Sequence, residues 1–228
     1  MKIKHLIFDL DDTLYSSSNA ITKAISDAMI SCVAEFFNIE FDKARILRSE
    51  NLPKHSSTLA WLMSCGLTDV EGYFAKVHPA DEVKYLSPAP QIRPLLESFN
   101  FPMTVLTNAP REHAERVLDF YGIKDLFSSI TDIRDCNLRG KPFAESFELA
   151  LKRAGGTVDD SLFIDDQLKY ALGFKVLGGT AVKVGQEESE EKIKNFPSFL
   201  FNEEKHGTLY KIPSIYELPE LLERFYLR

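Results

Sequence analysis

A short, largely apolar run near the start of the chain, Ile3 to Phe8, leads directly into three closely spaced carboxylates. A run of this length before a polar turn predicts a buried strand, and since Asp is a poor strand residue we expect the strand to end at about Asp9. Asp9, Asp11 and Asp12 then crowd together at its carboxyl end. Such carboxylates raise one another's pKa unless a cation lies among them, and their oxygens suit Mg²⁺. The same residue types cap helices, so this run alone leaves a metal site and a helix cap open.

Further apolar runs alternate with helical patterns along the rest of the chain. Buried strands are predicted at 103–106, 162–164 and 181–184, with a weaker strand at 130–133 and a short edge element at 196–201. Strands that alternate with helices indicate a parallel sheet with right-handed crossovers, which is a doubly wound, Rossmann-like α/β fold. The helices of this part are predicted at 92–99, at 110–121, from Pro142 to Gly155, from Asp166 to Leu177 and at 214–225.

The segment 16–85 differs from the rest because it contains no strand candidate. Apolar residues recur there at three- and four-residue steps from Ile21 to Phe37, which predicts an amphipathic helix. We therefore predict an α/β core of residues 1–15 and 86–228 and a helical insertion of residues 16–85. Three further helices of the insertion are predicted at 42–49, 57–65 and 68–77.

The composition narrows the classes of protein to consider. The net charge of −7 over 228 residues argues against non-specific binding to nucleic-acid polymers. A phosphate substrate stays compatible with this charge, because a bound cation and one well-placed lysine dominate the local field. The cysteines (Cys32, Cys65 and Cys136) have neither disulfide-framework nor zinc-site spacing, which fits a reducing cytoplasm. The sequence predicts no signal peptide and no membrane span.

Polar residues follow each of three predicted strands. They are Asp9 and Asp11, Thr107 and Asn108, and Asp165 and Asp166. Ligands of an open parallel sheet bind beyond the carboxyl ends of its strands, so we expect these side chains to converge there. Lys141, on a loop before a predicted helix, is placed to join them. The set supplies a carboxylate nucleophile, an acid/base, a hydroxyl, a cation and two further carboxylates, which are the parts that phosphoryl transfer needs.

The chain resembles the phosphohydrolases of the haloacid dehalogenase-like (HAD) superfamily in four motifs. The matching segments, in the family's order and spacing, are Phe8–Leu14, Leu106–Asn108, Gly140–Pro142 and Phe163–Asp166. The resemblance extends from about Lys2 to Val184. It implies a parallel-sheet core with a mobile helical cap that shields the site and selects the substrate, with hinges at 16–18 and 84–88.

The resemblance also implies catalytic roles. Asp9 would attack the phosphorus atom and carry the covalent phosphate. Asp11 would protonate the leaving oxygen and later deprotonate the attacking water. Thr107, the backbone of Asn108 and Lys141 would hold the phosphate oxygens.

A Mg²⁺ ion is the cofactor that the resemblance implies. Its ligands would be Asp9, the backbone carbonyl of Asp11 and the acidic pair that follows the third strand. Of that pair, we expect Asp166 to bind the ion directly and Asp165 to act from outside the ligand sphere.

A narrower resemblance points to the pyrimidine 5′-nucleotidase branch, and hence to nucleoside monophosphates such as UMP or CMP. Three departures accompany it: Asp12 stands where the branch has Asn, and Gln167 and Tyr170 stand in place of a Ser and an Asn. The exchanged groups would help orient the metal or Lys141, so activity or substrate can differ from that of the branch. The segments that carry the resemblance are Asp12–Tyr15, Tyr85–Pro90, Leu106–Leu118 and Asp132–Ile133.

Asp11 favours phosphate chemistry within the superfamily, because a dehalogenase needs the first Asp but no acid/base two residues later. A phosphatase or mutase acting on another small phosphometabolite, such as a sugar phosphate, shares the whole set and stays open. So does a catalytically weak protein that binds a phosphometabolite. A signalling receiver domain does not fit, because its first acidic cluster would be the metal pair and the helical insertion has no place in it.

Other charged residues are candidates for substrate contact. His113 and Arg111 follow Asn108 closely, and Arg48 and Lys54 lie in the predicted cap. We expect a small phosphorylated metabolite as partner, no nucleic-acid polymer and no membrane, in a cytoplasmic protein, and we leave a homodimer open. The histidines without metal-ligand spacing, for which a surface or satisfied role is expected, are His5, His55, His78 and His206.

Overall fold

The computed structural model describes residues 3–16, 18–202, 204–205 and 207–226. The chain divides into two compact units. The first unit holds the described residues of 1–17, 88–189 and 198–228, and the second holds those of 18–87 and 190–197. The segment 190–197, which the sequence analysis placed in the core, therefore groups with the helical unit. Ser17 of the predicted hinge and His206 lie outside the described residues.

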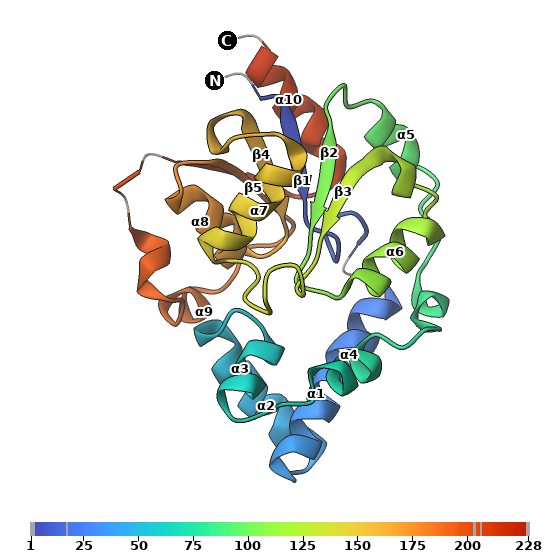
Figure 1. Cartoon of the computed structure of the whole chain (residues 1–228), viewed down its shortest axis with the longest axis vertical. Helices are drawn as coiled ribbons and strands as arrows, with labels where there is room; N and C mark the ends of the chain where they lie inside the picture. Colours follow the sequence, from blue (N-terminus) through green and yellow to red (C-terminus); the bar gives the residue numbers. More distant parts are fainter. Residues whose placement is uncertain (1–2, 17, 203, 206, 227–228) are drawn as a thin grey trace. The chain divides into compact units, whose positions relative to one another are not determined.

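A six-stranded parallel sheet forms the centre of the first unit (Figure 1). The strand order is β3-β2-β1-β4-β5-β6, so the chain builds outward from β1 to β3 and then returns to β4 on the other side of β1. This reversal is the switch point of a doubly wound, Rossmann-like sheet, as the sequence predicted. The strands are β1 (His5–Phe8), β2 (Met103–Leu106), β3 (Phe127–Thr131), β4 (Ser161–Asp165), β5 (Thr180–Val184) and β6 (Thr208–Ile212).

The central strands are apolar because helices cover both faces of the sheet. In β1, Leu6 lies opposite Met103 of β2 and Leu162 of β4. Helices α7 and α8 pack on one face of the sheet, and right-handed crossovers place α6 on the other (Figure 1). The helices of this unit are α5 (Ile92–Glu97), α6 (Arg111–Phe120), α7 (Ala144–Ala154), α8 (Leu168–Val176) and α10 (Leu218–Tyr226).

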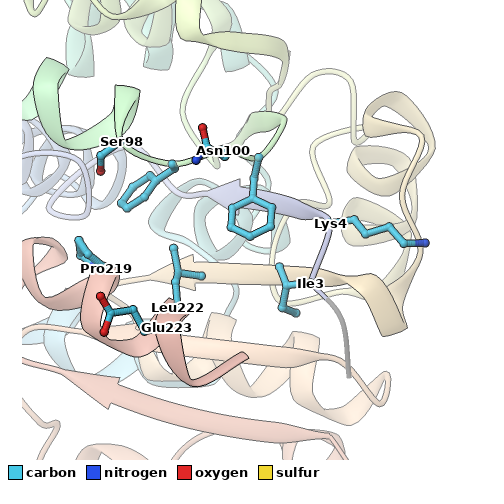
Figure 2. Close-up of a pocket in the computed structure, with 9 residues that line it drawn as sticks. Ile3, Lys4, Ser98, Asn100, Pro219, Leu222 and Glu223 are labelled. Atoms are coloured by element: carbon cyan, nitrogen blue, oxygen red, sulfur yellow. The ribbon is translucent and has the colours of Figure 1, made fainter. Parts of the chain in front are cut away.

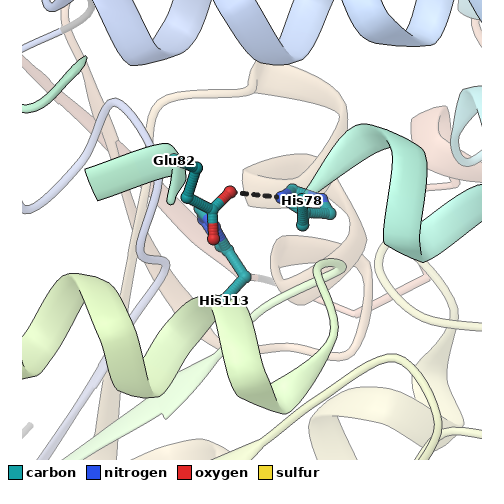
Figure 3. Close-up of side chains that lie close together, drawn as sticks. All are labelled: His78, Glu82 and His113. Atoms are coloured by element: carbon teal, nitrogen blue, oxygen red, sulfur yellow. Dashed lines mark hydrogen bonds and ion pairs between the residues drawn. The ribbon is translucent and has the colours of Figure 1, made fainter. Parts of the chain in front are cut away.

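The second unit is helical, and its described residues from 18 to 87 contain no strand. The ring of Phe37 stacks on Trp61 with 5.5 Å between the ring centroids. A buried pair follows the last long helix of this segment, with His78 Nδ1 3.2 Å from Glu82 Oε2 (Figure 3). Its helices are α1 (Ala20–Phe37), α2 (Phe41–Asn51), α3 (Thr58–Ser64), α4 (Val70–Val77) and α9 (Glu190–Lys194).

Three predicted elements need correction. The stretch 196–201 is not an edge strand but contains a 3-10 helix at Ser198–Phe201, and the edge strand is β6. β6 was not predicted because it has only five residues and their exposure is mixed, so its sequence shows no clear apolar pattern. β3 begins at Phe127, earlier than the predicted start at 130. Its two serines interrupt the apolar pattern, so the sequence predicted only the end of the strand. Pro142 does not open a helix: the Lys141–Pro142 peptide is cis, Phe143 is extended, and α7 begins at Ala144.

A pocket lies beside the amino-terminal end of β1 (Figure 2). Apolar side chains dominate its wall, and Lys4 at its edge pairs with Asp160 at 3.3 Å. None of the residues that the sequence analysis selected for chemistry lines this pocket. Within the described ranges, no helix combines the length and apolar character needed to cross a membrane.

Candidate active site

Asp9 takes its position from the pairing of the two central strands. Its backbone N–H donates to the carbonyl of Ile164 at 2.8 Å, which extends the β1–β4 ladder one residue beyond β1. The side chain of Asp9 is buried at the carboxyl edge of the sheet. The chain then turns, with Asp12 in the left-handed region at φ 59°, where Asp is one of the better tolerated residues.

Lys141 lies between two carboxylates. Its Nζ is 2.6 Å from Asp9 Oδ1 and 2.6 Å from Asp165 Oδ2, and the lysine side chain is fully buried. Burial opposes the charge on the lysine, but the two carboxylates outweigh it and raise the pKa of Lys141 above its ordinary value. The rings of Phe163 and Tyr170 lie 5.5 Å and 5.0 Å from Nζ, which adds favourable cation–π contact. Lys141 is therefore a fixed positive charge at this edge of the sheet.

The backbone of Lys141 is held by the side chain of Asn108. Asn108 Oδ1 accepts from the Lys141 N–H at 2.8 Å, and Asn108 Nδ2 donates to the Lys141 carbonyl at 2.9 Å. This two-point contact ties the loop before α7 to the end of β2. The approach requires Gly140, because a Cβ there would lie 2.0 Å from Asn108 Oδ1. This close approach explains why position 140 needs a glycine, which the sequence motif alone did not explain.

The acidic pair at the end of β4 is held by further contacts. Asp165 Oδ1 accepts from the Gln167 N–H at 2.7 Å, while its Oδ2 is engaged by Lys141. The Asp166 N–H donates to Thr13 Oγ1 at 2.9 Å, and the Asp166 carboxylate accepts from the side chain of Gln167. Thr13 thus joins the turn after β1 to the turn after β4.

The carboxylates of Asp9, Asp165 and Asp166 form one acidic group, with one ligand atom from each within 4.8 Å of the others; Asp9 and Asp165 are buried and Asp166 is half-buried. Burial and the charge of Asp165 raise the pKa of Asp9 to about 8. Burial also raises the pKa of Asp165, and burial together with the neighbouring carboxylates raises that of Asp166 well above its ordinary range. One lysine does not offset three such groups, and a hard divalent cation would. The donor set fits Mg²⁺.

Two more predicted residues complete this edge of the sheet. Thr107 follows β2 and is buried, and its Oγ1 accepts from the Ala109 N–H at 3.0 Å. Asp11 follows β1 on the turn, and its Oδ1 accepts from the Tyr15 hydroxyl at 2.5 Å. His113 Nε2 lies 2.7 Å from the same oxygen.

The predicted substrate-contact residues have specific surroundings. His113 is fully buried, with its Nε2 on Asp11. The Arg111 guanidinium binds the Ile130 carbonyl at 2.9 Å and Asp135 at 2.7 Å, so it stabilises the loop after β3. Arg48 lies in the helical unit, where its Nε donates to Thr58 Oγ1 at 2.9 Å. Lys54 ends a 3-10 helix in the same unit.

Sequence reasoning missed the roles of Thr13 and Tyr15 at this edge. Thr13 is separated from Asp166 by 153 positions, so no local spacing reveals their contact. Tyr15 lies four residues after Asp11, a spacing that brings side chains together in a helical turn, and this was the available signal.

Comparison with known proteins identifies the family. Residues 3–178 match the haloacid dehalogenase-like hydrolase family, and the chain belongs to it. A glyceraldehyde 3-phosphate phosphatase from Methanocaldococcus jannaschii is 29% identical over 195 residues, which cover 80% of this chain and 85% of that protein.

Solved structures share the fold. A HAD phosphatase from Thermococcus onnurineus is 20% identical with a TM-score of 0.64, covering 96% of this chain and 98% of its own. A hydrolase from Pseudomonas syringae has 21% identity and a TM-score of 0.65 over the same shares. An L-2-haloacid dehalogenase from Xanthobacter autotrophicus has 18% identity and a TM-score of 0.58, covering 97% and 98%. These structures support the α/β fold with an inserted helical segment.

Proposed function

We propose that this protein is a Mg²⁺-dependent phosphomonoester hydrolase that works through an aspartyl-phosphate on Asp9. The observation that carries the proposal is the placement of Asp9 and Lys141 at 2.6 Å, with Asp165 and Asp166 beside them at the carboxyl edge of the sheet. Asp11, two residues after Asp9, supplies the acid/base that phosphate chemistry needs and dehalogenation does not. The proposal therefore separates this chain from the dehalogenases that share its fold.

The proposed reaction has two steps. In the first, an Asp9 carboxylate oxygen attacks phosphorus, the bond from phosphorus to the leaving oxygen breaks, and Asp11 gives that oxygen its proton. In the second, Asp11 takes a proton from water as the water oxygen attacks phosphorus. The bond between Asp9 and phosphorus then breaks, and inorganic phosphate leaves. Thr107, the Asn108 backbone and Lys141 would hold the equatorial oxygens during both steps.

The metal would be held by Asp9, the backbone carbonyl of Asp11 and Asp166. Asp165 is the less available ligand, because one of its oxygens binds Lys141 and the other accepts from the Gln167 backbone. When bound, Mg²⁺ neutralises the charge that develops on the phosphoryl group. The assignment of Asp166 as the direct ligand follows the family resemblance and this difference in engagement.

The substrate is a small phosphorylated metabolite, and two classes have support. The curated relative that acts on glyceraldehyde 3-phosphate matches over most of the chain, which favours a triose or sugar phosphate. The short segments that resemble the pyrimidine 5′-nucleotidases favour UMP or CMP instead. We give the triose and sugar phosphates priority because their support spans 80% of the chain.

The test is phosphate release from a panel of substrates with Mg²⁺ and with a chelator. The panel holds glyceraldehyde 3-phosphate, glycerol phosphate, hexose phosphates, UMP, CMP, AMP and 4-nitrophenyl phosphate. Wild type is compared with Asp9→Asn and with Asp42→Asn, an exposed acidic residue of α2 that serves as the matched control. We expect Mg²⁺-dependent turnover in wild type and in the control and none in Asp9→Asn.

The outcomes separate the parts of the proposal. A preference for UMP and CMP would reverse the substrate priority and keep the chemistry. Turnover that survives Asp9→Asn would contradict the aspartyl-phosphate. A folded protein that binds Mg²⁺ and releases phosphate from no member of the panel would contradict the hydrolase assignment and favour a mutase or a phosphometabolite-binding protein.

A further inference from the structure

Asp11 receives two contacts on one carboxylate oxygen from two different elements. The Tyr15 hydroxyl, from the turn that follows β1, donates to Oδ1 at 2.5 Å. His113 Nε2, from the first turn of α6, lies 2.7 Å from the same Oδ1. An ionised carboxylate only accepts hydrogen bonds, so the His113 tautomer that satisfies this contact carries its proton on Nε2.

Tyr15 and His113 are both more buried than the Asp11 side chain that they contact. The His113 side chain is fully buried, whereas that of Asp11 is 32% exposed. The Tyr15 ring is also buried and stacks on Tyr121, with 6.0 Å between the ring centroids. The Tyr15 hydroxyl is a hydrogen-bond donor, and Asp11 Oδ1 accepts its hydrogen bond. Two buried donors therefore meet one partly exposed acceptor.

A partly exposed carboxylate without fixed partners samples several rotamers, and an acid/base must meet the reacting oxygen in one of them. We propose that Tyr15 and His113 are positioning residues, which hold the Asp11 carboxyl in the orientation that delivers its proton to the leaving oxygen. This inference rests on the proposed phosphomonoester hydrolysis. It assigns to His113 a contact with the acid/base, where the sequence analysis considered a contact with substrate.

The contacts from Tyr15 and His113 meet at one oxygen of Asp11, Oδ1. The transferred proton is that of the Asp11 carboxyl, which these contacts orient. That proton passes to the leaving oxygen as its bond to phosphorus breaks. A proton from the attacking water returns to Asp11 in the second step. Tyr15 and His113 keep their own protons throughout, because their role is to orient the carboxyl.

The test uses two leaving groups of different basicity. Glycerol phosphate has a strongly basic alkoxide leaving group that needs protonation, whereas 4-nitrophenolate leaves without it. General acid catalysis contributes roughly 10²- to 10⁴-fold, so a misplaced acid selectively slows the alkyl substrate. The comparison uses kcat/KM, because it reports the steps up to loss of the leaving group and excludes hydrolysis of the aspartyl-phosphate, which is common to both substrates. For Tyr15→Phe and for His113→Leu we expect kcat/KM on glycerol phosphate to fall about 10-fold or more. We expect kcat/KM on 4-nitrophenyl phosphate to fall much less.

Three controls distinguish positioning from structural damage. Tyr121→Phe removes a hydroxyl from the ring next to Tyr15 and should leave the ratio of the two activities unchanged. His113→Gln returns an amide donor close to the position of Nε2 and should restore part of the alkyl activity. In an Asp11→Asn background, Tyr15→Phe should have no further effect, because residues that act through one another are not additive.

An equal loss of kcat/KM on both substrates, or a full effect of Tyr15→Phe in the Asp11→Asn background, would overturn the inference. Thermal unfolding identifies a His113 variant that fails to fold, and Tyr15→Phe, which preserves the ring, then decides alone. A wild type that hydrolyses neither substrate nor any other phosphomonoester would overturn the proposed function, and the inference with it. A wild type that hydrolyses both, with unaltered selectivity in the variants, would overturn the positioning role alone.

Discussion

Lys141 Nζ lies 2.6 Å from Asp9 Oδ1, and both side chains are buried at the carboxyl edge of the sheet. The same Nζ lies 2.6 Å from Asp165 Oδ2. One cation therefore bridges the carboxylates that end two adjacent strands. Removing one member of a buried charge pair leaves its partner uncompensated, which is more destabilising than the net contribution of the intact pair.

Lys141→Met should destabilise the metal-free protein by about 3 to 5 kcal/mol, because Asp9 and Asp165 would then lie buried without a cation. It should also abolish phosphate release, since the oxygens of the transferred group lose their positive partner. Chemical denaturation with and without Mg²⁺ measures the first effect. Mg²⁺ should restore part of the stability, because it supplies positive charge to the same carboxylates.

The matched control for this change is Lys152→Met in α7, where the lysine is exposed. Exposed substitutions of this kind change stability by about 0.5 kcal/mol or less. Equal destabilisation by the two substitutions would mean that the bridge between β1 and β4 contributes nothing specific.

The metal-free protein should become less stable as the pH rises. Carboxylates in salt bridges usually have the opposite effect, a loss of stability as the pH falls. Burial, then Asp165, raises the pKa of Asp9 to about 8 from an ordinary value of 3.8. Between these values the folded metal-free protein holds a proton that the unfolded chain has released. Its free energy of unfolding therefore falls as pH rises, by up to about 1.4 kcal/mol per pH unit for one proton. Asp165 and Asp166 add to the same trend, since their pKa values are also raised.

Denaturation of the chelated protein from about pH 5.5 to about pH 8 measures this slope. Mg²⁺ stabilises the ionised carboxylates, so the slope should flatten when the ion is saturating. Asp9→Asn removes one of the carboxyls whose pKa is raised and should flatten the slope without any metal. A metal-free protein whose stability rises with pH over this range would contradict the proposed electrostatics of the acidic group.

The sequence predicted the sheet because each central strand is a short apolar run followed by polar residues. Asp9 and Asp165 were expected to converge because parallel strands end at one edge, and Lys141, on a loop before a predicted helix, was expected to join them. The contacts that hold them were not predictable from local patterns. Asp11 and His113 are 102 positions apart, and Thr13 and Asp166 are 153 positions apart.

The elements that were missed carry weak local signals. β6 is an edge strand, so one side of it needs no apolar partner and its pattern is short and mixed. Pro142 is typical of the first residue of a helix, but the extended Phe143 delays α7. In both cases the surrounding fold, rather than the local sequence, determines the secondary structure.

The contact between Asn108 and the Lys141 backbone gives a further prediction. Asn108→Ala removes two hydrogen bonds and should destabilise the protein by about 1 to 3 kcal/mol while lowering kcat, because Lys141 loses its support. Gly140→Ala should have a similar effect, since its Cβ would lie 2.0 Å from Asn108 Oδ1. Thermal unfolding and phosphate release measure both.

The two substitutions should not be additive. In the Asn108→Ala background the added Cβ of Gly140→Ala no longer meets the amide oxygen, and its remaining close neighbour is the flexible end of Ile133. A double-mutant cycle should therefore show the second change to be much less harmful than it is alone. Strict additivity would show that Gly140 is required for a reason other than the approach of Asn108.

Thr13 tests whether the turn after β1 and the turn after β4 act together in metal binding. Thr13 is buried, and its Oγ1 accepts from the Asp166 N–H at 2.9 Å. Thr13→Val keeps the volume but leaves that N–H without its acceptor, so we expect a loss of about 1 to 3 kcal/mol in stability. Because Asp166 is the proposed direct ligand, the apparent affinity for Mg²⁺ should fall about 10-fold or more.

Thr13→Ser is the matched control, since it retains the hydroxyl that accepts the bond. Phosphate release at increasing Mg²⁺ concentration reports the apparent affinity, and kcat at saturating Mg²⁺ should be far less affected than that affinity. If Thr13→Ser and Thr13→Val weaken Mg²⁺ binding equally, altered packing at this position, rather than loss of the hydroxyl acceptor, explains the effect. Thr13 would then have no specific part in placing Asp166.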